Sequence, residues 1–218
     1  AMEKQISESK GKLAKYLPQS GTGKRPAVKA KHNVEKFPKV EAKFVRFTIT
    51  KSSKAQPCID ELEIFSGTEN LALASKYAKA ISNGDFKHPL HKLAHINDGK
   101  YGNPKSWIAA QSTGWVQIEL PRVARINQIE WSRDRNGKLS DRLPIGYYIE
   151  AGLKVGEWKR IASSDDRQPF TGAKPDTPQY VFTGLPEAES KRGKSLFAKF
   201  EETKKQLAAL KNSTKVYA

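Results

Sequence analysis

Apolar and polar residues alternate along several short stretches in the middle of the chain. In KFVRFTIT (43–50), Val45, Phe47 and Ile49 are two residues apart, a spacing typical of a strand with one buried face. Similar stretches are CIDELEIF (58–65), WVQIEL (115–120), RINQIEWS (125–132), GYYIEAG (146–152) and EWKRIASS (157–164). Turn formers separate them, at Gly67, Asn83-Gly84, Asp98-Gly99, Asn136-Gly137 and Gly156. Many short strands without helices between them predict an all-β domain, an antiparallel β-sandwich or barrel.

The two ends of the chain have a helical period instead. Near the start, apolar residues have roughly helical spacing until Pro18, at Ile6, Leu13, Tyr16 and Leu17. After Pro186, residues recur at steps of four and three, at Leu196, Phe200, Thr203, Leu207 and Leu210. This seam is too short for a stable isolated coiled coil. It predicts a helix that packs on residues 1–17 as a hairpin, or on a partner protein.

These patterns divide the chain into four parts. They are a basic helical and linker arm (1–42), a β-sandwich domain (43–170), a linker (171–186) and an amphipathic helix (187–218). Residues 19–39 contain Gly, Pro and Lys without any period, which predicts a linker or an extended arm. No stretch approaches the length of apolar sequence that a membrane-spanning helix needs, so no membrane insertion is expected.

Composition adds a strong positive charge and a lone cysteine. The chain has 39 Lys and Arg against 23 Asp and Glu, a formal net charge of +16, and most of the excess lies outside the predicted β domain. Basic tails attract polyanions or serve as solvated linkers. Because the tails have no interleaved aromatic residues and no recognisable motif, no specific nucleic-acid partner is expected. Cys58 has no second cysteine to pair with, and we expect a buried thiol.

Several motifs, taken in order, resemble a known module. They are ENLALASKYAKA (69–80), HINDGKYGNPKSWIA (95–109), GWVQIELPRVARINQIEW (114–131), DRLPIGYYIEAG (141–152) and EWKRIASS (157–164). Together they resemble the discoidin domain, the coagulation-factor type C module, which has a galactose-binding-like β-sandwich fold. The strands that resemble FVRFTIT and CIDELEIF usually come last, but here they come first. The chain therefore resembles a circularly permuted module, and it lacks the cysteine pair of many secreted members.

The resemblance covers roughly residues 43–170 and has further implications. It implies an all-β, galactose-binding-like jelly roll with flanking helical segments. The permuted order, the PCIDELEIF stretch and the tail ending in KVYA also resemble a segment of large bacterial multidomain proteins that contain a c-type cytochrome region. This chain has no C-x-x-C-H haem motif. The resemblance favours an extracytoplasmic location, in the periplasm or at the cell surface.

The resemblance also implies a structural Ca²⁺ site. Discoidin-like carbohydrate-binding modules often bind Ca²⁺ through an Asp of the Asp-Gly loop, nearby carbonyl groups and a Glu of the terminal strand. The matching residues are Asp98 and Glu61, and Ser106 is a further candidate oxygen donor. The alternative is that Asp98 forms a turn with its own backbone and Glu61 faces solvent. Core positions are expected for three indoles, those of Trp107, Trp115 and Trp158.

A ligand on such a fold is expected in the loops at one end of the sandwich. The loop after Trp131 has many polar side chains that suit an acidic sugar: Arg133, Asp134, Arg135, Asn136, Lys138 and Arg142. Arg binds carboxylate and sulfate through paired hydrogen bonds, which favours an acidic or sulfated polysaccharide. Tyr101 and Tyr77 are candidates for a stacking face. The alternative is that the charged residues of this loop pair with one another and only hold its shape.

The sequence has no nucleophile elbow, phosphate-binding loop or paired-carboxylate active site. We therefore expect a non-catalytic carbohydrate-binding module that tethers a larger protein to its polysaccharide substrate. The alternative is a structural spacer or protein-interaction domain, whose partners are the neighbouring domains of the parent protein. Family resemblance alone does not choose between them, because one fold hosts many functions.

Overall fold

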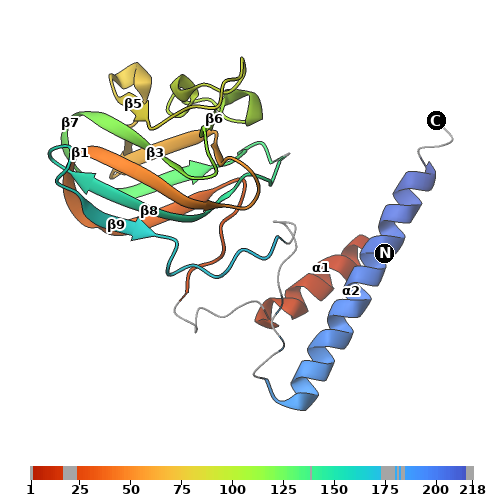
Figure 1. The fold of residues 1–218 in the computed structure, drawn as a ribbon. Helices are drawn as coiled ribbons and strands as arrows, with labels where there is room; N and C mark the ends of the chain where they lie inside the picture. Colours follow the sequence, from red (N-terminus) through yellow and green to blue (C-terminus); the bar gives the residue numbers. More distant parts are fainter. Residues whose placement is uncertain are drawn as a thin grey trace. The chain divides into compact units, whose positions relative to one another are not determined.

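The computed structural model describes residues 2–16, 24–137, 139–172, 180, 182 and 185–214. The chain forms two compact units (Figure 1). Residues Lys24–Pro175 form the first, which we call the β unit. Residues Ala1–Gly23 and Asp176–Ala218 form the second, the helical unit. Where the sequence pattern places the start of the β domain at residue 43, the β unit already begins at Lys24.

The β unit is mostly β-structure, with one large antiparallel sheet and one small sheet. In the large sheet the strand order is β4-β3-β7-β1-β8-β9, and β5 also pairs with β7. The strands are β1 (Asn33–Ser52), β3 (Glu61–Ser66), β4 (Glu69–Asn70), β5 (Lys79–Ser82), β7 (Gly114–Ser132), β8 (Pro144–Gly152) and β9 (Lys159–Ser163). The small sheet pairs β2 (Cys58–Ile59) with β6 (Trp107–Ile108). Short 3₁₀ helices lie in the loops, η3 (Ala74–Lys76), η4 (Leu93–His95) and η5 (Asn103–Lys105).

Two long strands, β1 and β7, form the centre of the large sheet. They pair antiparallel from Asn33 opposite Trp131 to Ile49 opposite Gly114, with irregularities in the register along the way. On its other side, β7 pairs with β5 along its first half and with β3 along its second half. The predicted strands WVQIEL and RINQIEWS are therefore one continuous strand. Residues 120–123 lie at an irregularity of the β1–β7 register, between the pairs Ala42–Ala124 and Phe44–Glu119.

Residues 24–39 correct the prediction of a linker over residues 19–39, of which residues 19–23 lie outside the described residues. Residues 33–39 belong to β1, and Val28 and Ala30 before it are buried. This segment has no apolar period because its inward side chains include Asn33 and Glu35, both buried. Polar residues can occupy such positions when they have hydrogen-bond partners, so hydrophobic periodicity alone does not reveal them.

One hydrophobic core fills the β unit. At its centre, the Phe47 ring stacks on Tyr147 with centroids 4.9 Å apart and meets the edge of Trp131 at 5.3 Å. Trp107 is fully buried, as predicted, and its indole nitrogen donates to Asp85 Oδ1 at 2.7 Å. Cys58 is also fully buried, as predicted, and burial raises the pKa of its thiol to about 11.

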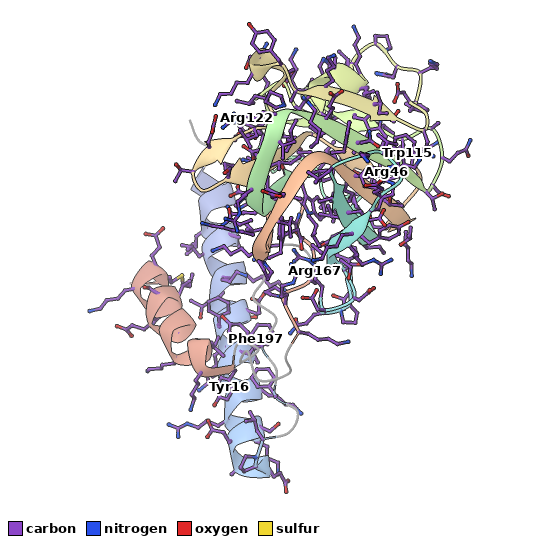
Figure 2. All side chains as sticks on the ribbon, turned by 90° about the vertical axis from the view of Figure 1, so that its left-hand side faces the viewer. Tyr16, Arg46, Trp115, Arg122, Arg167 and Phe197 are labelled. Atoms are coloured by element: carbon purple, nitrogen blue, oxygen red, sulfur yellow. The ribbon has the colours of Figure 1, made fainter. Side chains whose placement is uncertain are left out.

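The prediction of core positions for Trp115 and Trp158 is wrong. Both side chains are only half-buried, and the central carbon of the Arg46 guanidinium lies 4.2 Å from the Trp115 ring centroid (Figure 2) and 4.6 Å from the Trp158 ring centroid. Trp115 precedes the buried Val116, so strand alternation directs its side chain to the opposite face of the sheet. The second core indole is that of Trp131, which the sequence analysis did not single out.

The helical unit contains α1 (Met2–Leu13), η1 (Ala14–Tyr16) and α2 (Glu187–Thr214). Leu13, Tyr16 and Phe200 form a buried cluster, and Leu196 of the predicted seam packs against it; Tyr16 of this cluster is labelled in Figure 2. Tyr16 at the end of η1 donates its hydroxyl to Glu189 at the start of α2, at 2.8 Å, so the helices run antiparallel. The predicted hairpin is therefore confirmed. Neither helix is long and apolar enough to cross a membrane.

Candidate functional site

The loop that leads from β7 to β8 is held by a buried carboxylate between β2 and β3. Asp60 is fully buried. Its Oδ2 accepts hydrogen bonds from the Arg135 amide at 2.6 Å and the Gly102 amide at 2.9 Å, and its Oδ1 accepts from the Ser132 hydroxyl. Asp60 thereby joins the loop around residue 102 to the loop around residue 135. The sequence analysis missed this role, because no local pattern connects Asp60 to either loop.

Three of the predicted ligand residues serve to shape this loop. Arg133 is buried, and its guanidinium donates to Asn103 Oδ1 at 2.8 Å and Asp141 Oδ1 at 2.9 Å. Arg142 donates to Gln56 Oε1 at 2.9 Å. Asp134 is also buried, and its Oδ2 accepts from the Leu139 amide at 2.9 Å. The Arg133–Asp141 bond is a pairing within the loop of the kind that the alternative expected, whereas Arg142 bonds to Gln56 outside the loop and Asp134 accepts from a backbone amide.

Three other predicted ligand residues meet at one place. The Arg135 guanidinium lies over the Tyr101 ring, 4.1 Å from its centroid, and Asn136 Nδ2 donates to the Tyr101 carbonyl at 3.4 Å. Glu63 of β3 accepts from the Tyr101 hydroxyl at 3.1 Å and pairs with Arg135. We call these four residues the Tyr101 cluster. The remaining candidate, Lys138, lies outside the residues that the structure describes.

The Tyr101 cluster is open to solvent and depends on a glycine. Tyr101 is 36% exposed, and Asn136 is exposed beside it. Gly102 has a φ of +100°, and a Cβ at this position would collide with the Asn136 side chain. The close approach of the two loops therefore requires a residue without a side chain. The result is an accessible aromatic ring bordered by amide, guanidinium and carboxylate groups.

Two of the predicted metal residues, Glu61 and Asp98, are neighbours. The loop that contains Asp98 bonds to Glu61, and the charge of Asp98 acts on the Glu61 carboxylate. Glu61 is fully buried, so the alternative that it faces solvent is wrong. Its Oε1 accepts from the Gly99 amide at 3.1 Å, whereas its Oε2 is buried and has no hydrogen-bond partner among the described residues. Burial raises the pKa of Glu61 to about 9, and the charges of Asp98, Glu63 and Asp60 act in the same direction. Asp98 Oδ1 accepts from the Lys100 amide at 2.8 Å, which is the turn that the alternative expected.

Ser106, the third predicted metal residue, is engaged elsewhere. Its hydroxyl donates to the Asn103 carbonyl at 2.7 Å and lies 2.8 Å from His91 Nδ1. Within the described part of the chain, no group of three or more His, Cys, Asp or Glu side chains is placed to hold a metal ion. A cation at Glu61 would therefore need backbone carbonyl groups as most of its ligands, which Ca²⁺ accepts.

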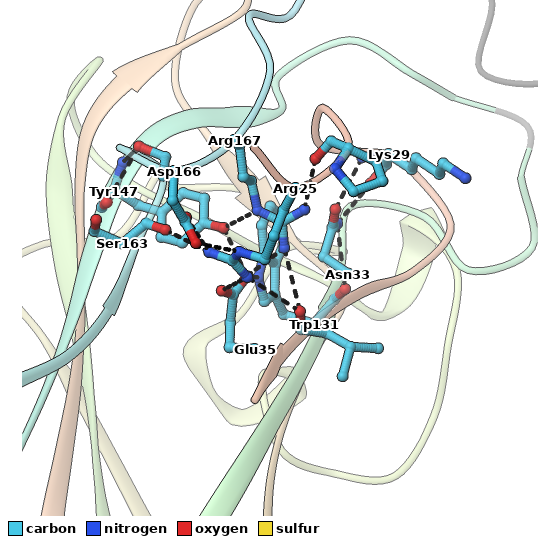
Figure 3. A network of polar contacts seen from close by, with 12 residues as sticks. Arg25, Lys29, Asn33, Glu35, Trp131, Tyr147, Ser163, Asp166 and Arg167 are labelled. Atoms are coloured by element: carbon cyan, nitrogen blue, oxygen red, sulfur yellow. Dashed lines mark hydrogen bonds and ion pairs between the residues drawn. The ribbon is translucent and has the colours of Figure 1, made fainter. Parts of the chain in front are cut away.

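A second buried carboxylate, Glu35 of β1, lies at the centre of a polar network (Figure 3). Its Oε1 accepts from the Tyr147 hydroxyl and Arg167 Nη2, both at 2.6 Å, and from the Trp131 indole at 3.3 Å. Its Oε2 pairs with Arg25, which also binds Asp166 with two hydrogen bonds of 2.6 and 2.7 Å. Burial and the charge of Glu35 both raise the pKa of Tyr147.

The Glu35 network has a structural role. Both carboxylate oxygens have partners, and the donors come from three distant segments, so it binds the chain before β1 to β8 and to the segment after β9. No sequence signal predicts it, since a single Glu in a strand usually faces solvent. Buried charges are costly unless they are paired, and here each one is paired.

No protein family, curated protein or solved structure matches this chain. The resemblance to the discoidin domain therefore rests on the order of its sequence motifs. Two features of the β unit can be related to a function. They are the accessible Tyr101 cluster and the incompletely bonded carboxylate of Glu61.

Proposed function

We propose that the β unit is a non-catalytic carbohydrate-binding module that tethers a larger protein to an acidic or sulfated polysaccharide. The observation that carries this proposal is the convergence of Tyr101, Arg135 and Asn136 from two separate loops. An aromatic ring offers an apolar surface to a sugar ring, and neighbouring polar groups set its orientation. The Tyr101 cluster supplies both at an accessible position.

The preference for an acidic ligand comes from Arg135. Its Nη2 pairs with Glu63 and its Nε donates to the Ser132 hydroxyl at 3.3 Å. No described residue accepts a hydrogen bond from Nη1. The guanidinium is therefore already held in place and still has donors for a carboxylate or sulfate group. A side chain that is ordered in advance loses less entropy on binding.

The arrangement of the strands supports the permuted discoidin class. The strands that come first in the chain, β1 and β3, both pair with β7, β1 along most of its length and β3 along its second half. Phe47 is paired near one end of the β1–β7 ladder, opposite Val116, and Trp131 is paired at the other end, opposite Asn33. The two rings are nevertheless in contact. A sheet that bends over its own core in this way supports a jelly-roll sandwich.

We further propose a structural Ca²⁺ at Glu61. A buried carboxylate oxygen without a hydrogen-bond donor is unfavourable, and a cation would satisfy it. Asp98 lies close enough for its charge to act on Glu61, and the Asp-Gly turn supplies further oxygens. Bound Ca²⁺ would neutralise these charges and hold the loop beside Tyr101. If no cation binds, burial would keep Glu61 protonated near neutral pH.

The carbohydrate proposal is tested by affinity electrophoresis in gels that contain a uronic-acid polymer, a sulfated polymer or a neutral polymer. We expect at least one acidic polymer to retard the protein. Tyr101→Ala and Arg135→Gln should each weaken binding about tenfold, which corresponds to about 1.4 kcal/mol. Tyr77→Ala is the matched control, because Tyr77 is 85% exposed in a different loop.

Two results would contradict the proposal. If no polymer retards the protein in the presence of Ca²⁺, the β unit is not a polysaccharide-binding module of this kind. If Tyr77→Ala weakens binding as much as Tyr101→Ala does, a ligand is bound but the Tyr101 cluster is not the site.

The second candidate function is protein interaction, and the feature of the chain that favours it is the helical unit.

A further inference from the structure

The helical unit has a groove between its two helices that is rich in positive charge. The groove has a volume of about 610 Å³ and is lined by Gly11, Lys12, Lys15, Tyr16, Arg192, Ser195, Leu196 and Lys199. Four of these eight residues are Lys or Arg, and none is Asp or Glu. Cations held close together repel one another, so an anionic partner would stabilise the groove.

Among the described residues, the four cations of the groove form one ion pair. Glu189 pairs with Lys15 at 2.6 Å, and the charge of Arg192 also acts on Glu189. For Lys12 and Lys199, no ion pair is formed within the described residues. Both side chains are exposed, one on α1 and one on α2, so the two helices offer positive charge to the same groove.

The lining of the groove also includes the apolar side chain of Leu196 and the ring of Tyr16. The hairpin has a small core, in which Leu13, Tyr16 and Phe200 are the buried apolar side chains. Two helices cover each other on one side only, and bundles usually add further helices to enclose the core. An amphipathic helix would therefore gain both charge pairing and apolar contact here.

We infer that this groove binds an acidic amphipathic helix of a partner protein. A second copy of the chain is disfavoured, because its groove would bring the same positive charges. Single-stranded nucleic acid needs open aromatic faces for stacking, whereas Tyr16 is 3% exposed and packs on Phe182 with ring centroids 5.3 Å apart. The inference concerns the helical unit only, and it stands whether or not the β unit binds polysaccharide.

The test measures binding to the full chain by fluorescence anisotropy. The probe is a labelled three-heptad peptide with Leu at positions a and d and Glu at most other positions. We expect saturable binding that the double variant Lys12→Gln/Lys199→Gln weakens about tenfold or more. The matched control Lys194→Gln/Lys205→Gln removes the same charge from exposed positions outside the groove and should change the affinity less than about twofold.

Helical circular dichroism of each variant verifies that the hairpin is intact, since all four positions are exposed. Absence of peptide binding would overturn the inference. Equal weakening by the two double variants would also overturn it, because net charge rather than the groove would then drive binding. Tighter binding of polyglutamate, a single-stranded oligonucleotide or phosphatidylserine vesicles would identify a general polyanion surface and reject the amphipathic helix.

Discussion

At the scale of single residues, the fully buried carboxylates of the β unit differ in how many hydrogen bonds they accept. Glu35 accepts hydrogen bonds from four side chains, and Asp60 accepts from two amides and a hydroxyl. Within the part of the chain that the structure describes, Glu61 accepts from one amide, and its second oxygen has no hydrogen-bond partner. Such bonds offset the free-energy cost of burying a carboxylate. Because Glu61 has too few of them, a bound cation or a proton must neutralise its charge.

Replacing Glu61 with Gln tests this balance. The pKa of Glu61 is raised from 4.5 to about 9, so the native state keeps a proton that the unfolded state releases. The unfolding free energy therefore falls as pH rises from about 4.5 to 9, by at most about 1.4 kcal/mol per pH unit. Without Ca²⁺, Glu61→Gln should have a higher melting temperature than the parent chain at pH 8, and the difference should shrink towards pH 5.

Added Ca²⁺ should reverse this order if it binds at Glu61. The parent chain should then gain stability by ligand binding to the native state, while Glu61→Gln should respond little. The measurement is thermal unfolding with EDTA and with Ca²⁺. An identical Ca²⁺ response in both proteins would place the cation elsewhere, and no response in either would reject the metal site and leave a protonated Glu61.

At the scale of secondary-structure elements, the helical hairpin depends on close approach at one position of α2. Gly193 is buried, and a Cβ there would lie 2.6 Å from the Phe182 ring and 2.9 Å from the Tyr16 ring. Both rings belong to the apolar cluster that joins the helices. Glycine is a poor helix former, but it is the residue that fits at position 193, because any side chain there would collide with these rings.

Two glycine substitutions separate helix propensity from packing. Gly11→Ala in α1 has open space around the new methyl group and should raise the free energy of unfolding of the hairpin by about 0.5–1 kcal/mol. Gly193→Ala has the same propensity gain, but the rings must move, so we expect a net loss of about 1–3 kcal/mol. Thermal loss of the helical circular dichroism signal measures both. A stabilising Gly193→Ala would mean that the rings do not pack on Gly193.

At the scale of the whole molecule, the β unit includes more chain than its apolar strands. Arg25 and Glu35 lie before the first clearly alternating stretch, yet they complete the network with Tyr147 and Arg167. Without the segment that contains them, Arg167 would remain buried without its carboxylate. Removing one partner of a buried ion pair typically costs about 3–5 kcal/mol, a large part of the stability of a domain.

Two fragments test where the β unit begins. Residues 24–175 should fold independently, with a melting temperature close to that of the β unit in the full chain, because the β-unit core lies within them. Residues 43–175 should be unfolded or strongly destabilised, since they lack Arg25, Glu35 and the part of β1 that pairs with residues 124–131 of β7. Urea unfolding followed by tryptophan fluorescence compares the two, and equal stability of both fragments would show that the Glu35 network is dispensable.

The sequence by itself determined which face of the stretch 43–50 is buried, and it predicted that the C-terminal helix packs either on residues 1–17 or on a partner protein. Alternation predicted the buried positions Val45, Phe47 and Ile49, and the seam on α2 predicted contact with α1, because local periodicity reports one-sided burial directly. It also selected Tyr101, Arg135 and Asn136 among the candidate ligand residues, but together with Arg133 and Arg142, which have structural roles.

Only the tertiary structure decided how the polar residues are used. Asp60, Glu61 and Glu35 obtain their partners from segments far away in the chain, and Trp115 lies outside the core because it falls on the other face of its strand. Hydrogen bonds and ion pairs depend on which distant atoms are brought within reach. That information is in the packing of the strands and loops, whereas the period of the sequence reports only which side of each element avoids water.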